Sequence, residues 1–333
     1  MRAVKDILMV ENLGVTLATK QGAIEPVRQV TFKVQKGETV GIVGESGCGK
    51  SITSLTIMGL LPKKQGKIKT GKIIFKGQDI TSYHEKKMRQ LRGNEMSMIF
   101  QEPMVALNPV FTIGDQLSQP LIVHTNLKKS AINRKVIEIL RLVGIPRAEK
   151  IVHQYPFELS GGMRQRIMIC LAIICKPDLL IADEPTTALD VTIQAQILDL
   201  LQKIKAENEM SVIFISHDLG VVAEICDRVI VMYAGQIVEQ ASAEEFFDHP
   251  IHPYSKGLLE SLPTEDERKG HLKTIPGHVP NPSQIPDGCP FSNRCPFVFD
   301  LCRKKAPPVI QLANRSFRCW LYSGTKEDLN GTK

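Results

Sequence analysis

A glycine-rich segment near the start of the chain has the residue types and spacing of a phosphate-binding loop. It matches G-x-x-x-x-G-K-[S/T] in full, and its residues are Gly44, Glu45, Ser46, Gly47, Cys48, Gly49, Lys50 and Ser51. The glycines allow successive backbone N–H groups to turn toward phosphate oxygens, beside the positive end of the following helix. Lys50 then reaches the β- and γ-phosphates, and the Ser51 hydroxyl binds Mg²⁺. The pattern predicts a site for a nucleoside triphosphate with Mg²⁺, in which Cys48 is a small filler.

An apolar run that ends in two carboxylates supplies the second part of such a site. Residues 179–182 are continuously apolar, and Asp183 and Glu184 follow them. Asp183 is placed to hold the metal ion, directly or through water, and Glu184 can polarise an attacking water as a general base. Alone, an acidic pair after a strand is as often a surface feature as a site. With the phosphate loop upstream, it predicts hydrolysis of the bound nucleotide.

A third segment distinguishes among the enzyme classes that share a phosphate loop. Residues 159–166 are Leu-Ser-Gly-Gly-Met-Arg-Gln-Arg and resemble the signature motif of ABC ATPases nearly letter for letter. Ser160, Gly161 and Gly162 stand at the start of an expected helix, where backbone N–H groups attract anions. Alone, they could be an N-cap and a flexible turn. Their order among the other motifs favours the ABC family.

Three further positions match the same family in chain order. They are Gln101 of the Q-loop, Asp190 of the Ala-Leu-Asp D-loop and the switch histidine His217. The resemblance covers about residues 8–260 and implies that the nucleotide is ATP, bound by the phosphate loop together with the signature residues and Asp190. It also implies three catalytic residues, Glu184, His217 and Gln101, and three Mg²⁺ ligands, Ser51, Gln101 and Asp183.

The family also implies a partner. In ABC ATPases two cassettes face each other head to tail, and each ATP lies between the phosphate loop of one and the Ser-Gly-Gly of the other. This chain has one loop and one signature, so a second cassette, identical or related, is implied. Hydrolysis would reopen the pair and move attached membrane subunits. Relatives usually stack an aromatic side chain on adenine; the matching residue is Leu17, whose aliphatic contact can substitute.

The hydrophobic pattern predicts an α/β fold. Nearly continuous apolar runs predict parallel strands buried on both faces at residues 39–43, 179–182 and 212–215. Residues 228–239 are typical of a terminal β-hairpin. Residues 130–143 and 161–175 have helical spacing in a region without strand runs.

Together with the resemblance, this pattern predicts a P-loop NTPase fold of ABC type. It would have a RecA-like parallel sheet core, an antiparallel β subdomain and a helical subdomain inserted at about residues 103–176. We expect the nucleotide-binding domain at residues 1–250. A smaller, proline-rich and irregular C-terminal module is expected at residues 251–333, because five prolines lie between Pro276 and Pro290.

Length and composition exclude some classes of protein. The 333 residues suggest roughly two domains. The net charge of +7 is far below the density of a dedicated nucleic-acid-binding domain. No apolar run approaches the 18 or so residues of a membrane span, and the first residues lack a signal-peptide layout. We therefore expect neither a secreted nor an integral membrane protein, whereas a peripheral one is compatible.

Longer stretches resemble one subfamily, the ATP-binding subunits of dipeptide and oligopeptide importers, which also includes some nickel importers. They are the phosphate loop, residues 100–103 with 107–109, residues 252–255, and Gly-Cys-Pro-Phe at 288–291 with Arg294 and Cys295. The resemblance implies two transmembrane permease subunits, an extracytoplasmic peptide-binding protein, and a peripheral position on the cytoplasmic face of the cell membrane.

Four of the eight cysteines crowd near the C-terminus with spacing C-x₅-C-x₆-C-x₁₆-C: Cys289, Cys295, Cys302 and Cys319. Four thiolates suit zinc or a [4Fe–4S] cluster. Zinc sites usually use pairs two to four residues apart, and no such pair is present, so the wide spacing favours the cluster, as does the resemblance to peptide-importer subunits. Free or disulfide-linked thiols are the remaining alternative. Nearby arginines could offset the cluster's negative charge: Arg294, Arg303, Arg315 and Arg318.

Besides an importer cassette for nickel, which the subfamily resemblance also allows, two other functions compete with peptide import. One is a soluble ABC ATPase acting on nucleic acid, which the positive charge favours weakly. The single cassette, the absence of CxxC pairs and the importer-like flanks oppose it, so no nucleic-acid partner is expected. The other is a regulatory cassette without hydrolysis, which the presence of both Glu184 and His217 opposes. The sequence does not identify the transported substrate.

Overall fold

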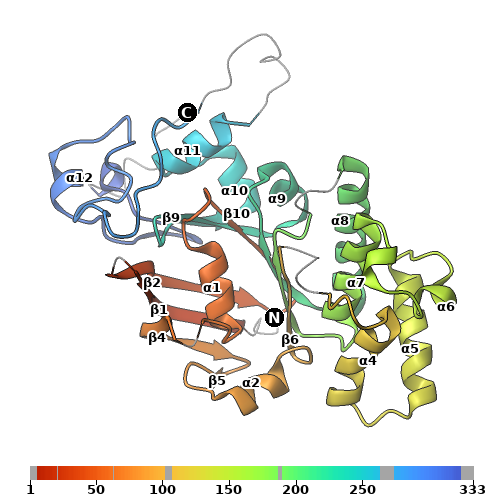
Figure 1. The fold of residues 1–333 in the computed structure, drawn as a ribbon. Helices are drawn as coiled ribbons and strands as arrows, with labels where there is room; N and C mark the ends of the chain where they lie inside the picture. The colour runs from red at the N-terminus through yellow and green to blue at the C-terminus, as the bar shows by residue number, and fades with distance from the viewer. Residues whose placement is uncertain are drawn as a thin grey trace.

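An eight-stranded sheet lies at the centre of the fold in the computed structural model (Figure 1). The structure describes residues 6–20, 22–62, 64–101, 107–186, 190–262 and 274–323. The strand order is β11-β12-β10-β9-β3-β8-β7-β6. Five neighbouring strands run parallel: β9 (Arg228–Tyr233), β3 (Thr39–Val43), β8 (Ser211–Ile215), β7 (Leu179–Asp183) and β6 (Met96–Ile99).

These strands are mostly apolar because each face of the sheet packs against a separate hydrophobic core. Along β8, Val212 and Phe214 belong to one core, and Ile213 and Ile215 belong to the other. The predicted strands are confirmed, with β7 and β8 each one residue longer than expected. The hairpin is also confirmed: β9 pairs with antiparallel β10 (Gln236–Ser242) through a turn in which both residues have positive φ.

One core is closed by a second, antiparallel sheet with the order β2-β1-β4-β5. Its strands are β1 (Asp6–Thr19), β2 (Gly22–Gln35), β4 (Gly66–Phe75) and β5 (Gln78–Asp79). The helix α1 (Lys50–Ile57) contributes Ile57 to the same core, and α2 (Glu85–Leu91) contributes Met88. The antiparallel β subdomain therefore packs over the helix that follows the phosphate loop.

Helices cover the opposite core. They include α8 (Val191–Asn208), α9 (Leu219–Ile225) and a helical group to the right in Figure 1: α4 (Ile113–His124), α5 (Lys129–Leu142), α6 (Ala148–Ile151), the 3₁₀ turn Pro156–Glu158 and α7 (Gly161–Ile173). The two predicted helices are confirmed as α5 and α7. The start of the predicted helical subdomain, residues 103–106, lies outside the described residues. Within the described segments, no helix has the length and apolar character needed to cross a membrane.

The C-terminal part contains more regular structure than expected. After α10 (Ala243–Asp248) and α11 (Pro253–Glu260) follow α12 (Asp300–Lys304), β11 (Ile310–Leu312), β12 (Arg315–Phe317) and a 3₁₀ turn at Trp320–Tyr322. β12 pairs with β10, so this segment extends the central sheet. Strands of three residues are too short to give a hydrophobic period.

A buried ion pair links β12 to β10 of the central sheet. Glu239 of β10 is fully buried, and its carboxylate accepts a hydrogen bond from Arg315 of β12 at 3.0 Å. The same carboxylate accepts the backbone N–H groups of Ile251 and His252, both at 2.9 Å. Arg315 also donates to the carbonyl of His249 at 2.6 Å. One carboxylate thus connects β10, the start of α11 and β12.

Replacing Arg315 with Met should destabilise the protein, because it leaves the Glu239 carboxylate buried without its cation. We expect a loss of about 3–5 kcal/mol in the free energy of unfolding, measured by denaturant titration. The double variant Glu239→Gln/Arg315→Met should recover part of it. Arg303→Met, at an exposed position on α12, is the control. A loss no larger than that of the control would contradict the role of the pair.

Candidate functional site

The phosphate loop joins the end of β3 to the start of α1, as its sequence requires. Gly44 has φ +146°, and a Cβ there would lie 2.2 Å from the carbonyl oxygen of Met232. Gly49 has φ +107°, and a Cβ there would lie 2.5 Å from the carbonyl oxygen of Pro26. Both positions exclude a side chain, so the glycines allow the loop to pack closely against β9 and β2.

Lys50 points back into the loop that it follows. Its ammonium donates to the carbonyl oxygens of Gly44 at 2.6 Å and Glu45 at 3.1 Å, and its side chain is buried. The buried Cys48 Sγ lies 3.8 Å from the same nitrogen. Burial raises the pKa of Cys48, so its thiol is neutral near pH 7. Lys50 therefore holds a positive charge at the mouth of a loop rich in backbone N–H groups.

A hydroxyl and a carboxylate meet beside the loop. Ser51 Oγ donates to Asp183 Oδ1 at 3.2 Å, joining α1 to the end of β7. Burial raises the pKa of Asp183 above its ordinary value, and the neighbouring Glu184 charge adds to the rise. Both are hard oxygen ligands, and Mg²⁺ commonly binds one or two protein oxygens together with substrate phosphates and water. Ser51 and Asp183 therefore fit the Mg²⁺ position that the sequence predicts.

Two predicted residues, Gln101 and His217, converge on the carboxylate of Glu184. Gln101 Nε2 donates to Glu184 Oε2 at 2.8 Å, and His217 Nδ1 lies 3.5 Å from the same oxygen. Glu184 has φ +50°, an unusual conformation for a residue with a side chain, and its N–H donates to Ile215 at 2.9 Å. The strained turn after β7 thus places the carboxylate next to the end of β6 and the loop after β8.

The signature residues lie at the start of α7, and in Figure 1 this helix stands apart from α1, which follows the phosphate loop. Ser160 is the N-cap, and its side chain accepts the N–H of Met163 at 3.3 Å. Gly161 and Gly162 form the first turn, where N–H groups point outward. Asp190 caps α8 in the same way by accepting from Ile193; residues 187–189 of the D-loop lie outside the described residues.

The four C-terminal cysteines line one cavity, together with Phe291 and several neighbours. All four are free thiols; Cys302 and Cys319 are buried, and Cys289 and Cys295 are half-buried. Burial raises the pKa of Cys289 to about 11 and that of Cys319 to about 12, with the other thiols adding to the rise. The topology therefore gathers the four residues as the sequence analysis expected.

The predicted metal centre, [4Fe–4S] or Zn²⁺, is not supported by this arrangement. Among the described residues, no group of three or more His, Cys, Asp or Glu side chains is placed to hold a metal ion. The nearby arginines also have other partners: Arg294 pairs with Glu45 and Arg315 with Glu239. These two arginines are therefore paired with carboxylates of other segments, and their predicted role beside a cluster stays a prediction.

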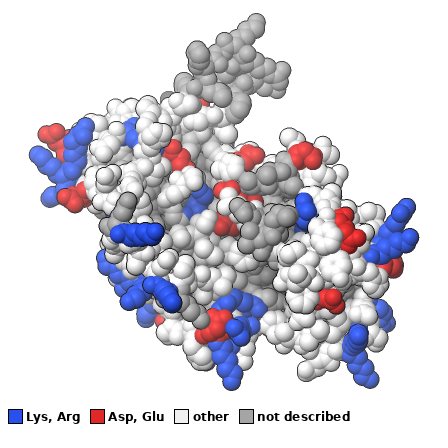
Figure 2. Space-filling view, in the orientation of Figure 1, with Lys and Arg blue, Asp and Glu red and all other residues white. Residues whose placement is uncertain are grey.

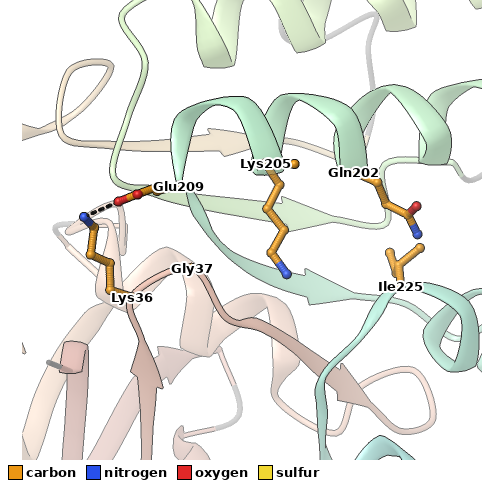
Figure 3. A pocket seen from close by; sticks show the side chains of 7 residues that line it. Lys36, Gly37, Gln202, Lys205, Glu209 and Ile225 are labelled. Atoms are coloured by element: carbon orange, nitrogen blue, oxygen red, sulfur yellow. Dashed lines mark hydrogen bonds and ion pairs between the residues drawn. The ribbon is translucent and has the colours of Figure 1, made fainter. Parts of the chain in front are cut away.

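A further surface pocket lies at the opposite edge of the sheet (Figure 3). Lys36 and Gly37 precede β3, whereas the phosphate loop follows it, and Glu209 ends α8. The Lys36 ammonium pairs with the Glu209 carboxylate at 2.6 Å across the pocket's rim. None of its lining residues belongs to the predicted motifs, so this pocket is separate from the candidate site.

Charged side chains on the face shown in Figure 2 form separate groups. Lysines and arginines lie mostly toward the periphery, with acidic side chains among them. Nucleic-acid-binding domains usually cluster positive residues along one stripe. This face therefore adds nothing to the nucleic-acid alternative.

Comparisons with known proteins agree with the motif order. Residues 27–187 match the ABC transporter family, and residues 238–302 match the oligopeptide/dipeptide transporter C-terminal region. The chain is similar to the oligopeptide transport ATP-binding protein AppD of Bacillus subtilis (strain 168), with 51% identity covering 95% of this chain and 97% of the relative. It is 50% identical to the dipeptide transport ATP-binding protein DppD of the same organism, covering 95% and 94%.

Solved structures agree on the fold. The dimeric post-hydrolysis structure of the ATP-binding cassette MJ0796, bound to ADP and Pi, matches with a TM-score of 0.64 and 26% identity, covering 71% of this chain and 98% of that chain. The structure of cbiO1 from Clostridium perfringens, part of the ABC transporter complex cbiONQ, matches with a TM-score of 0.62 and 28% identity, covering 74% and 92%.

The raised pKa of Asp183 predicts a pH-dependent stability difference. Because the folded state disfavours the charged carboxylate, Asp183 destabilises the nucleotide-free protein increasingly as pH rises above about 4. Asp183→Asn should therefore be more stable than the parent at neutral pH, with the difference shrinking on acidification. Denaturant titrations in EDTA across this pH range measure it, with Asp199→Asn, exposed on α8, as control. Equal stability at neutral pH would contradict the prediction.

Proposed function

Because the chain belongs to the family of ABC-transporter ATP-binding proteins with an oligopeptide/dipeptide transporter C-terminal region, we propose that it is the ATP-hydrolysing, energy-coupling subunit of a peptide importer. The observation that carries the activity is the convergence of Gln101 and His217 on the Glu184 carboxylate. The Ser51–Asp183 pair lies next to this carboxylate in sequence and space.

The residues of the site have separate roles in phosphate binding and hydrolysis. The loop N–H groups, Lys50 and the positive start of α1 hold the β- and γ-phosphates. Mg²⁺, bound by Ser51 and Asp183 with Gln101 nearby, would neutralise phosphate charge. Glu184 accepts a proton from the attacking water, and His217 and Gln101 orient that water and the carboxylate. A carboxylate held by two neighbours needs little reorganisation as the proton moves.

We propose that the active unit contains two cassettes. In Figure 1, α7 stands apart from α1, the helix that follows the phosphate loop, which opposes closure of Ser160, Gly161 and Gly162 over the nucleotide bound by the same chain. A second cassette, identical or related, would supply its signature to this loop and receive this chain's signature in return. The dimeric cassette structure of MJ0796, a protein similar to this chain, supports the proposal.

The remaining partners follow from peptide import. We propose that the cassette pair binds two transmembrane permease subunits at the cytoplasmic face of the membrane, and that a peptide-binding protein outside the cell acts through them. The names of the similar proteins favour peptides over nickel. In a reconstituted complex, ATPase stimulation by a peptide-loaded binding protein would support this substrate class, whereas stimulation by nickel or by duplex DNA would oppose it.

Glu184→Gln should abolish most ATP hydrolysis while leaving ATP binding intact, because it removes the general base but keeps the shape of the side chain. We expect a decrease in kcat of about 100-fold or more. Phosphate release and equilibrium ATP binding measure the two properties. Glu207→Gln, exposed on α8, should behave as the parent protein does. An unchanged rate in Glu184→Gln would refute the assignment.

A [4Fe–4S] cluster in the cysteine cavity, with Zn²⁺ as the alternative, also remains a proposal. Its support is that four thiols from distant positions line one cavity. Protein purified without oxygen should then contain about four iron atoms and about four acid-labile sulfides per chain. Cys289→Ser should lose them, whereas Cys175→Ser, at the end of the α7 region, should retain them. Zinc without iron would favour the alternative, and neither metal would refute both.

A further inference from the structure

We propose that Arg294 is a positioning residue for the phosphate loop, through which the C-terminal module (residues 251–333) sets the geometry of the ATP site. The contact links residues 249 positions apart in the chain. No motif in the sequence predicts it. The proposal rests on the ATP hydrolysis proposed above, and the experiments below separate the two.

The ion pair between Arg294 and Glu45 is bidentate. Arg294 donates from one terminal nitrogen to Glu45 Oε2 at 2.6 Å and from the other to Oε1 at 3.0 Å. The Arg294 side chain is only 4% exposed and that of Glu45 is 32% exposed, so the pair is shielded from solvent mainly on the arginine side. Two parallel hydrogen bonds fix the orientation of the carboxylate as well as its distance. Glu45 is the second residue of the phosphate loop.

Arg294 is itself held from the C-terminal side. Its Nε donates to the carbonyl of Pro276 at 2.8 Å, and a terminal nitrogen donates to the carbonyl of Ile275 at 3.2 Å. The guanidinium carbon also lies 5.8 Å from the centre of the Tyr233 ring, a cation–π contact. The guanidinium therefore connects the backbone of residues 275–276 to the phosphate loop, with hydrogen bonds on both sides.

A second contact from the module holds the loop backbone. The N–H of Glu45 donates to the hydroxyl oxygen of Tyr254, at the start of α11, at 2.9 Å. The Tyr254 ring is buried and packs against Tyr233 at 4.7 Å and Phe291 at 5.4 Å between ring centres. Phe291 also lines the cysteine cavity. The module thus fixes both the side chain and the backbone of Glu45.

These contacts affect the ATP site because the backbone of Glu45 also hydrogen-bonds to Lys50. The Glu45 carbonyl oxygen accepts from the Lys50 ammonium at 3.1 Å, and the Gly44 carbonyl accepts at 2.6 Å. Rotation of the 44–45 backbone would move these oxygens and change where the ammonium can reach. Lys50 is expected to bind the β- and γ-phosphates. Loss of the Arg294–Glu45 ion pair should therefore weaken ATP binding more than it slows the chemical step.

The test compares Arg294→Gln with Arg294→Lys in the full-length chain. Arg294→Gln should raise the KM for ATP by about tenfold, with kcat changed by less than about threefold. Arg294→Lys should give a smaller rise, because an ammonium keeps the charge but not the planar fork. The matched control is Arg303→Gln, exposed on α12 in the same module, which should match the parent. The Kd for ATP, measured in a Glu184→Gln background, should rise in parallel.

Tyr254→Phe provides a second route, because it removes the hydroxyl that accepts the Glu45 N–H and retains the aromatic ring. It should also raise KM and Kd. Unchanged KM and Kd in folded Arg294→Gln and Tyr254→Phe would overturn the proposal. A lower active fraction with unchanged KM would also overturn it, because that pattern indicates a purely structural role. A parent protein without ATPase activity would refute the proposed function instead, and the Kd comparison would still test the role of Arg294.

Discussion

The parallel register of β3, β8 and β7 is the constraint on which the candidate site depends. Ile42 of β3 and Asp183 of β7 both pair with Ile215 of β8, so the three strands end at one edge of the sheet. The phosphate loop, the turn at Glu184 and the segment bearing His217 start from this edge. Backbone hydrogen bonds between strands therefore bring together residues that are more than 100 positions apart. A shift of register by one residue would separate them and turn every side chain to the other core.

The sequence predicts this part well for a physical reason. Strands buried on both faces are nearly continuous apolar runs, and the phosphate loop needs glycines at fixed positions, so both leave a local signal. The helices α5 and α7 agree with their predicted ranges to within two residues at each end. The roles assigned to Gln101, Glu184 and His217 came from motif order, and the structure adds the distances between them.

The sequence predicts the C-terminal module poorly because long-range contacts define it. β11 and β12 have three residues each, and only pairing with β10 makes them strands. Arg294 and Arg315 lie within four residues of a cysteine in the sequence, which suggests a shared electrostatic role. In the fold each forms an ion pair with a carboxylate from the nucleotide-binding part of the chain: Arg294 with Glu45, and Arg315 with Glu239. Proximity along the chain is a poor guide where the backbone is irregular and proline-rich.

The strands added at β10 also affect how the molecule behaves toward its own copies. Without β12, the Glu239 region of β10 would be a free border of the central sheet, with unpaired N–H and C=O groups able to recruit another chain. β12 satisfies part of that border, and β11 replaces it with one only three residues long. Short outer strands are among the ways in which proteins avoid aggregation between sheet borders. On this side of the central sheet, the C-terminal segment thus leaves only the three-residue β11 open to pairing with another chain.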